Sequence, residues 1–280
     1  MQLIESTKKL TERLSQARRL GKRIGFVATM GYLHKGHLSL VRRARRENDV
    51  VVVSIFVNPT QFGPREDFKH YPRNLTRDKK LLKTGHVDYL FTPSRSLIYP
   101  KGFRHFIDPG PLARHLCGPK RPDHFRGVTT VVNRLFEIVK PHAAYFGEKD
   151  FQQARIIEEM VCKLHLPIKI KTCPIVRESD GLAMSSRNRY LSKKERISAR
   201  ALYKSLLEAK RLIRSGERNV SRVKKAIRSV LANHVSKIDY IEIVNPKKLA
   251  PVKRIQMPIL VALACYLGST RLIDNLLIKI

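Results

Sequence analysis

The chain has 280 residues, of which 42% are hydrophobic, so it is long enough to bury a sizeable core in two domains or one large one. Its 56 Lys and Arg against 23 Asp and Glu give a formal net charge of +33, which is compatible with a nucleic-acid partner, an anionic substrate or a basic bias without function. The four cysteines form no C-x-x-C pair, which excludes a zinc knuckle and a thioredoxin-type motif, and they are too few to suggest a disulfide framework. The first residues lack the apolar core of a signal peptide, and no apolar run is long enough to span a bilayer, so we expect a cytoplasmic protein without a membrane partner.

Strand-like and helical patterns alternate through the first two thirds of the chain. The spacing of apolar residues predicts an amphipathic helix over residues 2–20. Short apolar runs then predict strands, and amphipathic patterns between most of them predict helices. Continuous apolar strands are typical of a parallel sheet covered on both faces, so we expect an α/β domain over residues 1–176. The strands are expected at 24–28, 50–56, 87–91, 143–146 and 168–172, and the helices at 38–47, 74–84, 127–139 and 150–163.

The pattern changes after about residue 176. The sequence SKKE, residues 192–195, is a capping box that predicts the start of a long helix ending near residue 214, and a second helix is expected over residues 219–235. Helices followed by strands favour a smaller α+β domain over residues 177–280, with the boundary in a polar stretch at its start. The strands are expected at 239–244, 257–266 and 271–278.

The loop TMGYLHKGH, residues 29–37, is the first candidate site, because a parallel sheet binds ligands beyond the carboxyl ends of its strands. It leads from a strand into a helix, whose N-terminus offers free N–H groups and partial positive charge to an anion. Its glycines let the backbone approach an anion closely, and His34 and His37 can add hydrogen-bond donors. The loop therefore predicts a phosphate site. A metal pair formed by the two histidines, or a loop without function, stays open.

Two further loops carry polar side chains suited to substrates. NPTQFGP, residues 58–64, places the neutral amides of Asn58 and Gln61 after the next strand, where they can bind carboxylate or hydroxyl groups or simply form an Asn-Pro turn. MSSRN, residues 184–188, combines two hydroxyls with the planar donors of Arg187 at the expected domain joint. This loop is either a phosphate clamp or a serine-rich surface turn.

The stretch FGEKDFQQ, residues 146–153, follows another expected strand. Its Lys149 can meet a phosphate. Asp150 and Gln153 also fit a D-x-x-Q cap at a helix start. The two interpretations are compatible, so the stretch alone decides neither.

Seven motifs in order link these loops to a known family. They are ATMGYLHKGHLSLV, VSIFVNPTQFGPREDFKHYPR, RPDHFRGVTTVV, YFGEKDFQQ, DGLAMSSRNRYLS, DYIEIVNP and RLIDN. Together they resemble the pantothenate synthetase (pantoate–β-alanine ligase) family from about residue 24 to the C-terminus. The H-x-G-H-like loop and the downstream M-S-S element are also similar to the nucleotidylyltransferase superfamily, which includes class I aminoacyl-tRNA synthetases. The resemblance implies an α/β fold, with a Rossmann-like parallel-sheet domain and a smaller C-terminal α+β lid domain.

The resemblance also implies an activity. Members of the family activate pantoate with ATP, release pyrophosphate, and let the amine of β-alanine attack the pantoyl adenylate, which gives pantothenate and AMP. Mg²⁺ is implied because it arrives with ATP, and a dedicated metal site on the protein is not. Pantoate, β-alanine and ATP would be the small-molecule partners, the chain would form a homodimer, and no specific nucleic acid would bind.

Roles for individual residues follow from the matched motifs. His37, His34, Lys149 and Arg187 would be catalytic, Gln61 would bind pantoate and β-alanine, and Gln153 would bind pantoate. Asn58 is expected beside them because its neutral amide lies in the same loop as that of Gln61. The residues expected to bind ATP are Met30, Gly31, Tyr32, Leu33, His34, Lys35, Gly36, His37, Gly147, Glu148, Lys149, Asp150, Val176, Met184, Ser185, Ser186 and Arg187.

Three positions depart from the family pattern without removing an expected ligand. Ala28 stands where proline is usual, Cys117 where an acidic residue is common, and Phe151 where tyrosine is frequent. Two alternative functions stay open: another nucleotidyl-transferring or adenylate-forming enzyme on the same scaffold, and a basic nucleic-acid-binding protein. The amides of Gln61 and Gln153 suit a small hydroxy acid better than a phosphorylated acceptor. The sequence also lacks an aromatic RNA-binding motif.

Overall fold

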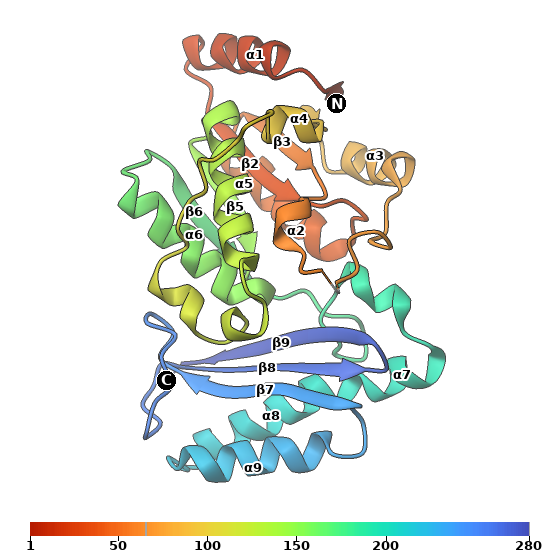
Figure 1. Ribbon diagram of the computed structural model, residues 1–280, viewed down its shortest axis with the longest axis vertical. Helices are drawn as coiled ribbons and strands as arrows, with labels where there is room; N and C mark the ends of the chain where they lie inside the picture. Colours follow the sequence, from red (N-terminus) through yellow and green to blue (C-terminus); the bar gives the residue numbers. More distant parts are fainter. Residues whose placement is uncertain (65, 280) are drawn as a thin grey trace.

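The computed structural model describes residues 1–64 and 66–279, and its larger part is built on a six-stranded sheet (Figure 1). All neighbouring strands of this sheet are parallel, in the order β1-β4-β3-β2-β5-β6. We call this part, with its helices, the parallel-sheet region. The expected parallel α/β architecture is confirmed. The strands are β1 (Gln2–Ile4), β2 (Ile24–Thr29), β3 (Val50–Ile55), β4 (Tyr89–Phe91), β5 (Ala143–Gly147) and β6 (Lys169–Cys173).

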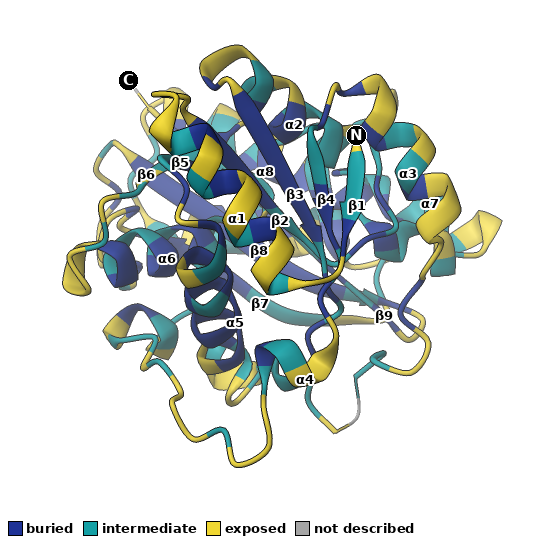
Figure 2. Cartoon of the chain, turned by 90° about the horizontal axis from the view of Figure 1, so that it is seen from above, coloured by how far each residue is buried: buried dark blue, intermediate teal, exposed yellow. Residues whose placement is uncertain are grey.

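Helices cover both faces of this sheet, which explains why its central strands are apolar along most of their length. One face packs against α1 (Thr7–Arg19), α5 (His124–Val139) and α6 (Phe151–Lys163) through a cluster that includes Phe26 and Phe136. The other face packs against α2 (Lys35–Glu47) and α3 (Leu75–Thr84). Figure 2 shows the buried strands between helices whose outer faces are exposed. Apolar burial on both faces is the main stabilising term for such a sheet. The short helix α4 spans Arg95–Ile98.

Two expected helices differ in the structure. The helix expected over residues 2–20 begins only at Thr7, because β1 pairs with β4 and the Ser6 side chain then caps α1. The long helix expected from the capping box is divided into α7 (Lys193–Ser198) and α8 (Arg200–Arg214). The capping box itself is present at Ser192. The division lies at the fully buried Ala199, from which α8 places its apolar stripe on the antiparallel sheet.

A separate three-stranded antiparallel sheet forms the lower part of Figure 1. Its strands are β7 (Lys237–Val244), β8 (Ile259–Leu267) and β9 (Thr270–Ile278), in that order across the sheet. Helices α8 and α9 (Val220–Leu231) pack on one face. We call these five elements the antiparallel-sheet region, and they confirm the expected smaller α+β part.

The second face of the antiparallel sheet packs against the parallel-sheet region. Alternate residues of β8 divide between two clusters: Val261 and Leu263 belong to the cluster under α8 and α9, whereas Leu260 and Ala262 contact residues such as Ile156 of α6. The two regions therefore share an apolar interface, which fixes β9 beside the loops of the parallel sheet.

The remaining helical turns are of the 3-10 type and lie in the connections. They are η1 (Pro59–Gln61), η2 (Pro111–Arg114), η3 (Gly118–Lys120), η4 (Glu148–Asp150) and η5 (Ser186–Tyr190). Among the residues that the structure describes, no helix has the length and apolar character needed to cross a membrane.

Candidate active site

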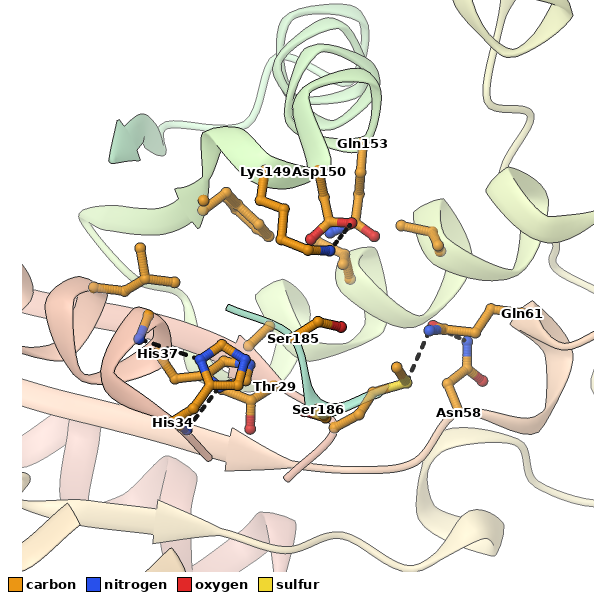
Figure 3. A pocket seen from close by; sticks show the side chains of 18 of the residues that line it. Thr29, His34, His37, Asn58, Gln61, Lys149, Asp150, Gln153, Ser185 and Ser186 are labelled. Carbon is orange, nitrogen blue, oxygen red and sulfur yellow. Dashed lines mark hydrogen bonds and ion pairs between the residues drawn. The ribbon is translucent and has the colours of Figure 1, made fainter. Parts of the chain in front are cut away.

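A cavity of about 230 Å³ opens where β2, β3, β5 and β6 end, and all four loops singled out in the sequence contribute to its wall (Figure 3). Gly31, Tyr32, Leu33, Lys35 and Glu148 are not among the lining residues. The expected site residues that line the cavity are Met30, His34, Gly36, His37, Asn58, Gln61, Gly147, Lys149, Asp150, Gln153, Val176, Met184, Ser185, Ser186 and Arg187.

His34 and His37 form a capping box at the start of α2. The backbone N–H of Gly36 donates to Nδ1 of His34 at 3.2 Å, and the backbone N–H of His34 donates to Nδ1 of His37 at 3.3 Å. The ring centroids lie 4.0 Å apart. A side chain at Gly36 would force the His34 ring to move, because its Cβ would come within 2.9 Å of that ring. The histidines thus satisfy two backbone donors that a helix start leaves free.

This capping fixes the tautomer of both rings. A nitrogen that accepts a hydrogen bond carries no proton, so each neutral ring has its N–H at Nε2. Burial, together with the Lys149 ammonium, lowers the pKa of His34 to about 4. Burial lowers the pKa of His37 well below its usual value, and His34 and Lys149 add to the effect. At neutral pH the cavity wall therefore holds two neutral imidazoles, each with one N–H donor.

Asp78 anchors the part of the loop that precedes the histidines. Its side chain is buried, and its carboxylate accepts the backbone N–H of Tyr32 at 2.7 Å and of Leu33 at 2.8 Å. Tyr32 has a φ of 49° and Gly31 a φ of 81°, so the chain turns through the left-handed region here. These residues shape the loop from behind, which explains why they are not in the cavity wall.

Gln61 lies across the cavity from the two histidines, and neighbouring side chains hold it in place. Asn58 donates through Nδ2 to Oε1 of Gln61 at 3.2 Å and to the carbonyl of Gly127 at 3.0 Å. Its Oδ1 accepts from the Tyr99 hydroxyl at 2.7 Å. Asn58 is 1% exposed, so its amide is engaged by the protein and orients Gln61. The Nε2 of Gln61 contacts the sulfur of Met30 at 2.8 Å.

Arg187, expected as a phosphate clamp, is paired with a carboxylate in this structure. Its Nε and Nη2 donate to the two oxygens of Asp67 at 3.0 and 2.7 Å, and its guanidinium lies over the ring of Tyr71. The neighbouring hydroxyls tie the segment to the rest of the site: Ser185 accepts from the backbone N–H of Arg187, and Ser186 donates to the carbonyl of Tyr32. The segment is thus a built part of the cavity wall, in contrast to the alternative of a surface turn.

A second arginine of the cavity wall was not singled out in the sequence. Arg121 donates through Nε and Nη2 to the two oxygens of Glu66 at 2.6 and 2.5 Å. Its Nη1 lies 2.9 Å from Nε2 of His124, whose Nδ1 lies 2.7 Å from the carbonyl of Gln61. Burial, together with Arg121, lowers the pKa of His124 to about 4. The motif RPDHF holds both residues, but nothing in its spacing shows that they reach a loop sixty residues earlier.

Lys149 lies across the cavity from the histidines, on the 3-10 turn that follows β5 (Figure 3). Its Nζ is 3.8 Å from Oδ1 of Asp150. The alternative of a helix cap is wrong for Asp150, because its side chain makes no capping hydrogen bond to α6. Both side chains and Gln153 line the cavity. Nowhere in residues 1–64 and 66–279 do three His, Cys, Asp or Glu side chains gather as a metal site would require.

Comparisons with known proteins agree with this geometry. Residues 2–277 match the family described as pantoate-beta-alanine ligase. The chain is 54% identical over 279 residues to the pantothenate synthetase of Fervidobacterium nodosum, covering all of both chains, and 54% identical over 280 residues to that of Thermotoga neapolitana, covering 98% of this chain and 99% of the relative.

Solved structures give the same result for the fold. A pantothenate synthetase from Thermus thermophilus superposes with a TM-score of 0.95 at 44% identity, with complete coverage of both chains. A pantoate-beta-alanine ligase from Francisella tularensis, crystallised with beta-gamma ATP and beta-alanine, superposes with a TM-score of 0.82 at 37% identity and covers 99% of this chain and 97% of its own. The family match over nearly the whole chain, together with these identities, shows that the chain belongs to the pantoate–β-alanine ligase family.

Proposed function

We propose that this chain joins pantoate to β-alanine at the expense of ATP, through a pantoyl adenylate, and releases AMP and pyrophosphate. The observation that carries the proposal is a single cavity with two kinds of wall. Two imidazole N–H donors at the start of α2 face Lys149 across the cavity, and the neutral amides of Gln61 and Gln153 also line the cavity. The ATP analogue and β-alanine in the Francisella tularensis relative support both substrates.

The triphosphate would lie against the histidines and Lys149. The pantoate carboxylate attacks the α-phosphorus, an acyl–phosphate bond forms, and pyrophosphate leaves with the electron pair of the broken bond. Negative charge grows on the phosphate oxygens in this step. The Nε2–H donors of His34 and His37, the Lys149 ammonium and the start of α2 would stabilise that charge without rearranging. His37 would contribute most, as the family pattern implies.

Pantoate would lie between Gln61 and Gln153. Neutral amides can bind a carboxylate and hydroxyl groups without adding charge. The pantoate carboxylate therefore keeps its negative charge and can attack as a nucleophile. In the second step the amine of β-alanine attacks the acyl carbon, an amide bond forms as nitrogen loses a proton to solvent, and AMP leaves with the electron pair of the broken acyl–oxygen bond. Asn58 and His124 hold Gln61 in place through its side chain and its backbone carbonyl.

Mg²⁺ would enter with ATP. Asp150 supplies the only carboxylate among the described residues that line the cavity, which fits an ion held mainly by phosphates and water rather than by a protein cage. We also propose that the chain divides into domains at residues 176 and 177, that it acts in the cytoplasm, and that it forms a homodimer as the resemblance implies.

The experiment that tests this function is exchange of labelled pyrophosphate into ATP. We expect exchange to require pantoate and not β-alanine, because adenylation is complete before the amine reacts. Exchange supported equally well by a phosphorylated acceptor would favour another nucleotidyl-transferring enzyme. Oligonucleotide binding that is tight, sequence-selective and resistant to physiological salt, without any exchange, would favour a nucleic-acid-binding protein.

A further inference from the structure

The motif RLIDN, residues 271–275, lies on β9 of the antiparallel-sheet region, and the proposed reaction gives it no role. Its Asn275 side chain reaches across to the parallel-sheet region, and its Asp274 side chain contacts Arg177 in the segment that follows β6. Asn275 is 6% exposed, and its Nδ2 donates to the carbonyls of Glu148 at 2.9 Å and Lys149 at 3.0 Å. The amide therefore holds two consecutive peptide groups of the turn that carries the Lys149 ammonium.

The preceding residue holds a second part of the cavity wall. Asp274 is 2% exposed and accepts from Nη1 and Nη2 of Arg177 at 2.7 and 3.0 Å. Arg177 also lies over the ring of Tyr203, with its guanidinium carbon 3.7 Å from the centroid. Arg177 follows Val176, which lines the cavity and accepts the backbone N–H of Met184 at 3.0 Å. Oδ1 of Asp274 accepts the backbone N–H of Asn275, so the two contacts brace each other.

We propose that Asn275 is a positioning residue for the reaction, which acts through Lys149. This inference rests on the proposed function, because it takes Lys149 to meet the phosphates of ATP. A lysine ammonium sits on a flexible stem, so the protein can place it only by fixing the backbone and packing the stem. Asn275 fixes that backbone from outside the cavity with two hydrogen bonds. Pre-organised charges of this kind act strongly because they do not have to be reoriented during binding.

The contacts also explain how the antiparallel-sheet region takes part in the site. A small cavity between the two regions is lined by Asn275 and Asp274 on one side and by Lys149, Asp150 and Gln153 on the other. The last three residues also line the main cavity. The apolar interface around Leu260 and Ile156 holds β9 at this place. A shift of β9 would therefore move the Lys149 turn.

A double-mutant cycle tests the inference by equilibrium binding, which requires no turnover. The probe is adenosine 5′-(β,γ-methylene)triphosphate with Mg²⁺, titrated calorimetrically into the full chain. Wild type, Asn275→Ala, Lys149→Ala and the double variant are compared. We expect Asn275→Ala to weaken binding about tenfold and Lys149→Ala by at least as much. In the Lys149→Ala background, loss of Asn275 should change affinity by less than about twofold, because its effect passes through the missing ammonium.

Asn133→Ala is the matched control. Asn133 is 7% exposed, and its amide donates within its own helix to Glu137, so its loss tests a buried amide that does not reach the Lys149 turn. We expect unchanged affinity. If Asn275→Ala does not fold, Asn275→Ser replaces it in the cycle, because the hydroxyl keeps one donor, and thermal unfolding reports folding for each variant. A smaller loss, of about threefold, is then expected.

The outcomes separate the inference from the function. Independent losses that multiply in the double variant, or an Asn275→Ala variant that binds like wild type, would overturn the positioning role and leave the proposed function standing. A Lys149→Ala variant with wild-type affinity would overturn the phosphate site at Lys149, and the inference with it. Coupled losses in the cycle support both.

Discussion

The cavity has two walls that differ in how their basic side chains are paired. On the histidine wall, formed by His34 and His37 and faced by Lys149 across the cavity, burial keeps the imidazoles neutral, and the Lys149 ammonium supplies the positive charge. On the arginine wall, formed by Gln61, Arg121, His124 and Arg187, each guanidinium is paired with a carboxylate of the segment that follows Gln61.

The difference shows at which wall a polyanion should bind more favourably. Glu66 and Asp67 already engage Nε and Nη2 of Arg121 and Arg187, so an incoming phosphate would have to displace a carboxylate to use those donors. The histidine wall requires no displacement, because its Nε2–H donors are set by backbone capping. The triphosphate should therefore bind first on the histidine wall. The arginine wall should contribute only when Glu66 and Asp67 release the guanidinium groups.

The largest effect is expected from His37→Ala. Removing one pre-organised donor from developing negative charge typically lowers a rate by about 10²- to 10³-fold. The fold should survive, because the residue is half-buried at a helix start and contributes little to the core. Single-turnover formation of pantoyl adenylate measures the loss, and circular dichroism checks the fold.

His37→Gln sharpens this prediction. A glutamine keeps a neutral N–H donor, so it should recover part of the lost rate if donation matters more than proton transfer. His34→Ala should have a milder effect, seen mainly as a raised KM for ATP. A folded His37→Ala variant that forms adenylate at nearly the wild-type rate would remove the histidine wall from the chemistry.

The arginine wall is tested by two substitutions with opposite expected signs. Arg187→Ala should raise the KM for ATP about tenfold, because a charge-assisted hydrogen bond to phosphate is lost. Asp67→Asn should lower that KM by about threefold, because Arg187 no longer has to break an ion pair before it can bind a phosphate. Steady-state kinetics at saturating pantoate gives both numbers. If both variants lose ATP affinity alike, the Arg187–Asp67 pair works as an oriented unit and the displacement described here is wrong.

Acid sensitivity is the smallest expected effect, and both walls contribute to it. The pKa values of His34 and His124 are lowered to about 4 from an ordinary 6.5. Above pH 6.5 both histidines are neutral in the folded and in the unfolded chain, so they do not make the free energy of unfolding depend on pH. Between pH 6.5 and 4 the unfolded chain binds more protons, so the free energy of unfolding falls as pH falls, by at most about 1.4 kcal/mol per pH unit for each histidine.

Urea unfolding at pH 7, 6, 5 and 4.5 measures this slope. His34→Gln tests the histidine wall and His124→Gln tests the arginine wall. Each substitution should make the slope of the unfolding free energy against pH shallower, by up to about 1.4 kcal/mol per pH unit. Slopes that match wild type in both variants would mean that these rings do not carry the acid loss.

The site was predictable from the sequence where its residues are local. His34, His37 and Gly36 lie within four positions of one another, so a strand, a glycine-containing loop and a helix start are enough to predict that they share one part of the cavity wall; phosphate binding there stays a prediction. Gln61 and Lys149 are predictable in the same way, because each lies in a loop that follows a strand. The alternation of apolar runs likewise predicted the parallel sheet.

The remainder depends on contacts between distant residues. Asp78 reaches the Tyr32 backbone across 46 positions, and Arg187 meets Asp67 across 120. No local pattern encodes either pair, because each forms only when the sheet and its loops are assembled. The same holds for β1, which is three residues long and becomes a strand only through pairing with β4. Ala199 is similar, since tertiary packing rather than helix propensity divides the helix there.

Nitrogen-15 NMR of the chain with labelled histidine tests the central claim most directly. Assignment comes from the spectra of His34→Gln and His37→Gln. At pH 7, both rings should show the neutral tautomer with the proton at Nε2, and the Nε2 signals should shift when adenosine 5′-(β,γ-methylene)triphosphate and Mg²⁺ are added, while Nδ1 stays an acceptor. A proton at Nδ1, a charged ring at pH 7, or Nε2 signals that do not respond to the nucleotide would contradict the account.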